Sequence, residues 1–129
     1  MPRYLSAEWF EDVNQAASGN DQLRTDTAGV TLTIQQVVTG SPDGDVHYTV
    51  RVRDGAVDVN LGDDPAADVT MTEAWDTAVK VASGGLSPAT AFMTGRIRVA
   101  GNVGALLDAQ GSLRELDKVF EGLRERTTF

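Results

Sequence analysis

The sequence contains no cysteine and only one histidine, His47. Without a thiol the chain forms no disulfide bond, has no cysteine nucleophile and offers no thiolate ligand to a metal. In the alternating segment around it, His47 faces away from Tyr48 and Val50. We therefore expect a surface residue that has no partner for a catalytic triad or a metal site. These absences argue against an enzyme, a metal site and a bound cofactor.

Long hydrophobic runs are also missing. No apolar stretch is long enough to cross a membrane, and the opening segment MPRYLSAEWF lacks the apolar core of a signal peptide. We therefore expect a cytoplasmic protein without stable membrane insertion. Basic side chains are outnumbered by acidic ones, and the net charge of −8 opposes binding to nucleic acid.

Charged side chains gather at a few places without forming a recognisable site. The carboxylates of the segment Asp63–Asp68 lack the spacing of a dedicated calcium loop, which favours a solvated turn. Arg51 with Arg53, and Arg96 with Arg98, occupy outward positions of two expected strands. These arginines either meet a lipid head group or phosphate, or keep an exposed strand soluble.

Patterns that predict strands and helices alternate along all 129 residues. Period-two alternation predicts strands at residues 30–38, 46–53, 56–61, 68–72 and 96–99. Helical spacing and capping residues predict helices that begin at Ser6, Thr72, Ser87, Val103 and Ser112. We expect a single α+β domain, residues 1–129, whose antiparallel-rich sheet of about five strands is covered on one face by helices.

Some positions carry a specific expectation. Asp54-Gly55 predicts a two-residue hairpin turn. Thr72 and Ser112 are expected to cap helices, the latter as part of a capping box. Leu61 is expected to point inward with the other apolar residues of its strand.

The segment from Ser87 to Leu107 is the most informative part of the chain. Ser87 and Pro88 predict a helix start, and Gly95 permits a left-handed exit from that helix. Residues 96–99 then alternate as a strand, and a glycine turn leads into another apolar helix. Large apolar side chains thus lie on several neighbouring elements, which is typical of a module that forms an apolar pocket.

This segment resembles the signature of the sterol carrier protein 2 family, at Pro88, Ala91, Phe92, Gly95, Arg96, Ile97, Arg98, Val99, Gly101 and Asn102. Upstream, the segment Ala67–Thr72 is similar to a strand of the same family. The resemblance is to the bacterial single-domain type. It implies a fold that holds an apolar ligand between its helices and one side of its sheet.

The candidate ligand site is an apolar cavity expected between the final helix and the region Phe92–Val99. Its expected walls are Trp75, Val79, Leu86, Phe92, Met93, Ile97, Leu107, Leu116 and Phe120. The apolar stripe of the final helix either covers this cavity or simply packs on the sheet as core. The choice between an open tunnel and a filled core depends on volume.

The resulting hypothesis is non-catalytic binding, with possible transfer, of a fatty acid, a fatty acyl thioester or a sterol, driven by apolar burial. The alternative is an accessory domain that partners an enzyme acting on lipophilic substrates, which an exposed apolar patch near the last helix would favour. An enzyme in its own right would need an acid/base group such as a carboxylate pair in the pocket.

Overall fold

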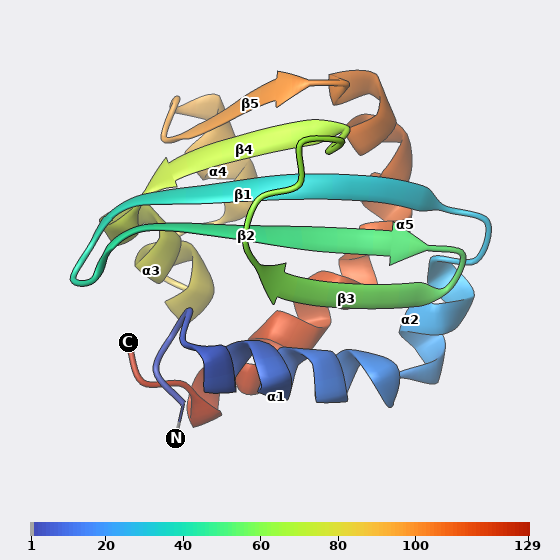
Figure 1. Cartoon of the computed structure of the whole chain (residues 1–129), viewed down its shortest axis with the longest axis horizontal. Helices are drawn as coiled ribbons and strands as arrows, with labels where there is room; N and C mark the ends of the chain where they lie inside the picture. The colour runs from blue at the N-terminus through green and yellow to red at the C-terminus, as the bar shows by residue number, and fades with distance from the viewer. Residues whose placement is uncertain (1) are drawn as a thin grey trace.

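Five strands form one sheet, and the helices pack against one of its faces (Figure 1). The computed structural model describes residues 2–129. In chain order the elements are α1 (Ala7–Ser18), α2 (Asp21–Asp26), β1 (Thr31–Ser41), β2 (Gly44–Arg53), β3 (Ala56–Leu61), β4 (Val69–Ala74), α3 (Trp75–Ser83), α4 (Pro88–Met93), β5 (Ile97–Gly101), α5 (Val103–Leu123) and a 3-10 turn (Arg124–Arg126). This is the predicted α+β architecture.

The strands lie in the order β3-β2-β1-β4-β5. The pairs β1–β2, β2–β3 and β4–β5 are antiparallel, whereas β1 and β4 are parallel. The antiparallel-rich sheet is therefore confirmed. The connection from β3 to β4, residues 62–68, passes in front of β2 and β1 in Figure 1, on the face that the helices leave open.

The core lies between the sheet and the helices. Alternation along each strand directs every second side chain toward the helices, where apolar side chains leave water. On β1 and β2 the buried side chains of this face include Leu32, Ile34, Val38, Tyr48, Val50 and Val52. Opposite them, α1 and α5 contribute Trp9, Phe10, Val13, Ala17, Leu116, Val119 and Leu123.

Several local predictions are confirmed. The hydroxyl oxygens of Ser6 and Ser87 accept hydrogen bonds from backbone N–H groups three residues on, at 3.3 and 3.1 Å. Pro88 occupies the first turn of α4, where a missing N–H group costs no hydrogen bond. Asp54 and Gly55 have φ angles of 46° and 89°, as a tight two-residue hairpin turn requires.

The predicted helix start at Thr72 is wrong. Thr72 lies within β4, and α3 begins at Trp75 after Ala74, which provides no side-chain cap. Pairing of β4 with β1 and β5 extends the strand past Thr72, so that hydrogen bonding across the sheet outweighs the local capping signal. As a consequence Glu73 belongs to a strand rather than to the first turn of a helix.

The predicted helix start at Ser112 is also wrong, because Ser112 lies inside α5. The cap of this continuous helix is Asn102, whose side-chain oxygen accepts from the backbone N–H of Ala105 at 3.0 Å. Gly111 does not end the helix, because an interior glycine costs only about 1 kcal/mol relative to alanine and packing on the sheet offsets that cost.

Two smaller differences concern the first half of the chain. The helix α2 was not predicted, and it begins after Asn20, whose side chain accepts from the backbone N–H of Leu23 at 2.9 Å. Leu61, predicted to point inward, is 53% exposed. It is the last residue of β3, an edge strand, so the core does not extend far enough to cover it.

Candidate functional site

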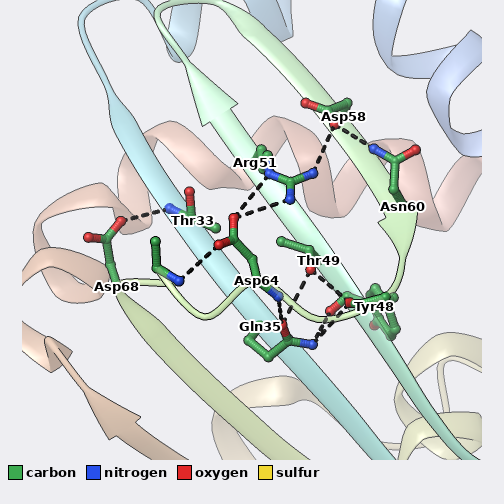
Figure 2. A network of polar contacts seen from close by, with 11 residues as sticks. Thr33, Gln35, Tyr48, Thr49, Arg51, Asp58, Asn60, Asp64 and Asp68 are labelled. Atoms are coloured by element: carbon green, nitrogen blue, oxygen red, sulfur yellow. Dashed lines mark hydrogen bonds and ion pairs between the residues drawn. The ribbon is translucent and has the colours of Figure 1, made fainter.

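The open face of the sheet carries a polar network that holds the β3–β4 connection (Figure 2). The side-chain oxygen of Gln35 accepts from the backbone N–H of Asp64 at 2.7 Å. Its amide nitrogen donates to the carbonyl oxygens of Tyr48 and Gly62 at 3.1 and 3.3 Å. The hydroxyl of Thr49 also donates to Gly62, at 2.9 Å. These contacts explain why Gln35 is buried although it faces away from the helices.

The acidic segment Asp63–Asp68 was predicted to be a solvated turn, but two of its carboxylates bind to residues of the sheet. The carboxylate of Asp64 forms an ion pair with Arg51 at 3.1 Å. The pKa of Asp64 is lowered, first by a hydrogen bond from the backbone N–H of Ala66 and second by the hydrogen bond from Arg51. Asp68 accepts from the backbone N–H of Thr33 at 2.9 Å. The carboxylates thus fasten the connection to β1 and β2.

His47, expected to be a surface residue without a partner for a catalytic triad or a metal site, lies 2.6 Å from a carboxylate oxygen of Asp63. Both side chains are exposed to water, at 40% and 67%. Within residues 2–129 no three His, Cys, Asp or Glu side chains gather where they could hold a metal ion.

The residues predicted to line a cavity separate into two groups. Those that are buried or packed against the core are Ile97, Leu116, Trp75, Val79 and Phe120. Those that are exposed are Phe92 at 53%, Met93 at 84% and Leu107 at 57%, while Leu86 is partly buried. In this structure they do not form the wall of one closed space.

Two hollows open at the surface, and neither contains a residue of the predicted set. The first, of about 380 Å³, is lined by Pro2, Glu8, Glu11, Asp12, Gln15 and Arg126. The second, of about 310 Å³, is lined by Ala17, Ser18, Arg24, Asp54, Gly55, Ala56 and Val57. The apolar cavity beside α5 thus stays a prediction.

The helix-covered side of the sheet is rich in aromatic rings. Seven of the eight aromatic residues form one connected cluster: Tyr4, Trp9, Phe10, Tyr48, Trp75, Phe120 and Phe129. The ring centroids of Trp9 and Phe120 are 5.9 Å apart and stacked, and those of Tyr4 and Trp75 are 5.5 Å apart. The cluster joins the N-terminal segment, α1, β2, α3 and α5. The remaining aromatic residue, Phe92 on α4, lies outside this cluster and is exposed.

Glu73 brings a carboxyl group to this apolar side. On β4 it follows Val69 and Met71 at alternate positions, and its register partners are Val38 on β1 and Ile97 on β5. Its Oε2 atom is buried and has no hydrogen-bond partner among the described residues. Burial raises the pKa of Glu73 to about 7.

The carboxyl group of Glu73 contributes to the raised pKa of two tyrosines. The pKa of the Tyr4 phenol is raised mainly by burial and further by the negative charge of Glu73. The pKa of Tyr48 is also raised mainly by burial, and the negative charges of ionised Tyr4 and Glu73 raise it further. Glu73 therefore lies within electrostatic range of two phenols that belong to the aromatic cluster.

Sequence reasoning missed Glu73, although a signal for it was present. The alternation Val69, Met71 predicts that the next inward position is residue 73. The capping role assigned to Thr72 ended the predicted strand two residues before its actual end at Ala74, so that Glu73 fell outside the predicted strand.

A comparison of the sequence with protein families identifies the group to which this chain is related. The profile of the SCP-2 sterol transfer family matches residues 10–114. That range contains all five strands together with α2, α3 and α4. The chain belongs to the SCP-2 sterol transfer family. The resemblance found in residues 67–107 is confirmed, and the family's function is lipid binding and transfer.

Solved structures show the fold of this family in other proteins. A crystal structure of sterol carrier protein 2 has a TM-score of 0.76 and 20% identity, covering 92% of this chain and 98% of that one. The solution structure of a conserved hypothetical protein from Thermus thermophilus, described as possibly a sterol carrier protein, has a TM-score of 0.75 and 19% identity, covering 95% and 91%. Palmitated SCP2L2 from Aedes aegypti has a TM-score of 0.62 and 19% identity, covering 90% and 95%.

Two further findings complete the comparison. No curated protein matches the sequence. Within the described part of this SCP-2 family member, no helix has both the length and the apolar character needed to cross a bilayer.

Proposed function

We propose that this protein binds a fatty acid, a fatty acyl thioester or a sterol on the helix-covered side of its sheet and transfers it unchanged. The observation that carries the proposal is the family match over residues 10–114, which spans the whole sheet. The aromatic cluster on the same side adds support, since ligand sites of this kind are mostly apolar with few polar groups.

The ligand contacts belong to α3, α4, β5 and α5. They are the side chains predicted from the sequence: Trp75, Val79, Leu86, Phe92, Met93, Ile97, Leu107, Leu116 and Phe120. Three of them, on α4 and α5, have exposed side chains, namely Phe92, Met93 and Leu107. Covering them with an acyl chain gains roughly 25 cal/mol per Å² of apolar surface removed from water.

The protein acts without catalysis in this proposal. His47 is the strand neighbour of Tyr48, whose side chain is buried on the helix-covered face, so His47 and its partner Asp63 lie on the opposite, open face and are exposed to water. His47→Ala should therefore leave lipid binding unchanged. A hydrolytic or redox turnover that disappears with this substitution would contradict the proposal.

A second candidate function is favoured by the same exposed side chains. Exposed apolar side chains such as Phe92 and Met93 on α4 suit an accessory domain that docks on an enzyme acting on lipophilic substrates. The two functions differ in one respect: only the first requires the isolated chain to bind lipid.

The test is a titration of the isolated protein with a fluorescent fatty acid. Serine replaces Phe92, Met93 and Leu107 in turn. Leu61→Ser is the matched control, because Leu61 on the far strand β3 is 53% exposed, close to Phe92 at 53% and Leu107 at 57%. Each of the first three changes should weaken binding about five- to tenfold, from the lost apolar burial. Equal affinities for all four variants, or no binding by the parent protein, would contradict the lipid-binding proposal.

A further inference from the structure

The Oε2 atom of Glu73 is a buried oxygen without a partner in the described part of the chain. Native proteins pair nearly all buried polar side-chain atoms. A buried acceptor that stays unpaired has lost its hydration without compensation. A bound molecule that donates a hydrogen bond to this oxygen would remove the penalty.

Glu73 lies among the elements that carry the proposed ligand contacts. Ile97 is its register partner on β5, and α3 starts two residues later at Trp75. The helix α4 contacts both α3 and β5. The exposed side chains of Phe92 and Met93 therefore belong to a helix that packs on the two elements flanking Glu73.

The surroundings of the carboxyl group are apolar on several sides. Val38, its neighbour on β1, is 0% exposed, and Ile97 on β5 is 6% exposed. The rings of Tyr4 and Trp75 lie together nearby. Burial is the cause of the raised pKa of Glu73, and no described cation lowers it. A single polar acceptor at the end of an apolar surface suits a ligand with an apolar chain and one polar end.

We propose that Glu73 forms the polar end of the lipid site and accepts a hydrogen bond from a hydroxyl group, so that the protein selects a long-chain alcohol over the corresponding fatty acid. This inference rests on the proposed lipid-binding function. A hydroxyl donates to either protonation state of Glu73. An ionised fatty acid would place a second negative charge beside the first, which disfavours binding. An ether has no hydrogen to donate and would leave Oε2 unpaired.

The experiment compares three probes with the same twelve-carbon chain: dodecan-1-ol, dodecanoate and dodecyl methyl ether. Affinities are measured by displacement of the neutral dye Nile red at about pH 8, where Glu73 and dodecanoate are both ionised. The parent protein should bind the alcohol about tenfold more tightly than the ether, as a hydrogen bond to a charged group implies. It should also prefer the alcohol to dodecanoate.

Variants at Glu73 separate the hydrogen bond from the charge. Glu73→Leu should bind the alcohol and the ether equally. Glu73→Gln removes the negative charge and should bind dodecanoate more tightly than the parent; its amide N–H group can donate to the ether oxygen, so its preference for the alcohol over the ether should be smaller than that of the parent. Glu125→Gln, at an exposed carboxylate in the 3-10 turn, should reproduce the parent in every comparison. Thermal melts confirm that each variant is folded.

Two results would overturn the inference while leaving lipid binding intact. One is equal affinity of the parent for the alcohol and the ether. The other is a preference for the alcohol that survives in Glu73→Leu. A parent protein that binds none of the three probes contradicts the proposed function itself, and the inference falls with it.

Discussion

Glu73 on β4 and Ile97 on β5 are register partners, so a carboxyl group lies beside a buried aliphatic side chain on the helix-covered face of the sheet. Burial raises the pKa of this carboxyl to about 7. Its unpaired oxygen makes the protein less stable than a chain with a well-paired or apolar side chain at this position. Groups that lower stability in this way are commonly kept for function.

The first prediction concerns the pH dependence of stability. The pKa of Glu73 is about 7 in the folded protein, against 4.5 for an unperturbed glutamate. Between these values the folded state keeps a proton that the unfolded state has released, so the free energy of unfolding falls as the pH rises. Glu73→Gln should remove this fall and, above pH 7, exceed the parent by up to about 3 kcal/mol.

Urea denaturation at a series of pH values measures this effect. Glu125→Gln is the control, because its carboxylate is exposed, and its profile should follow that of the parent. Parallel profiles for the parent and Glu73→Gln would show that the carboxyl group is not buried in solution.

The second prediction concerns the tight turn that leads into α5. Gly101 has a φ of +97°, and a Cβ atom there would lie 2.6 Å from the carbonyl oxygen of Asp68. Gly101→Ala should therefore lower the free energy of unfolding by about 2 kcal/mol or more. Thermal or urea denaturation gives the value, and a neutral substitution would refute the close approach of these two backbones.

The third prediction concerns Gly111, a glycine inside α5. An added Cβ at Gly111 meets nothing within 4 Å, and the residue lies inside α5. Gly111→Ala should raise the free energy of unfolding by about 1 kcal/mol, because alanine favours a helix interior. A loss of stability would indicate that two helices meet at this position instead of one continuous helix.

The fourth prediction concerns the polar network on the open face. Gln35→Ala removes hydrogen bonds to Asp64, Tyr48 and Gly62 and takes away the side-chain acceptor of the Asp64 backbone N–H. The expected loss of stability is about 2–4 kcal/mol. Gln22→Ala, at an exposed residue of α2, should change stability by less than about 0.5 kcal/mol. Faster hydrogen exchange at the amide of Asp64 should accompany the Gln35 substitution, and unchanged exchange would argue against the network.

Local signals in the sequence predict much of the fold. Ser6 and Ser87 as caps, and Asp54-Gly55 as a turn, depend on neighbouring residues alone, and the structure confirms each of them. The errors at Thr72 and Ser112 have a common origin. Each has a plausible local capping pattern, and in each case pairing or packing with distant parts of the chain decides the outcome.

The site is predicted less completely, because it depends on which distant residues lie side by side. The parallel pairing of β1 with β4 joins segments separated by two other strands, and no short-range pattern specifies it. That pairing is what places Glu73 between Val38 and Ile97. Phe92 and Ile97 are both apolar residues of the family signature, yet Phe92 is exposed and Ile97 is buried. The residue type alone does not predict this difference in burial.

The most direct test of lipid binding is native mass spectrometry of the freshly purified protein. We predict a species heavier than the polypeptide by the mass of one lipid, which is lost when the protein is denatured. After the lipid is removed, incubation with a fatty acid or a long-chain alcohol should restore a one-to-one complex. The bare polypeptide mass alone, both as purified and after incubation with each lipid, would contradict the account.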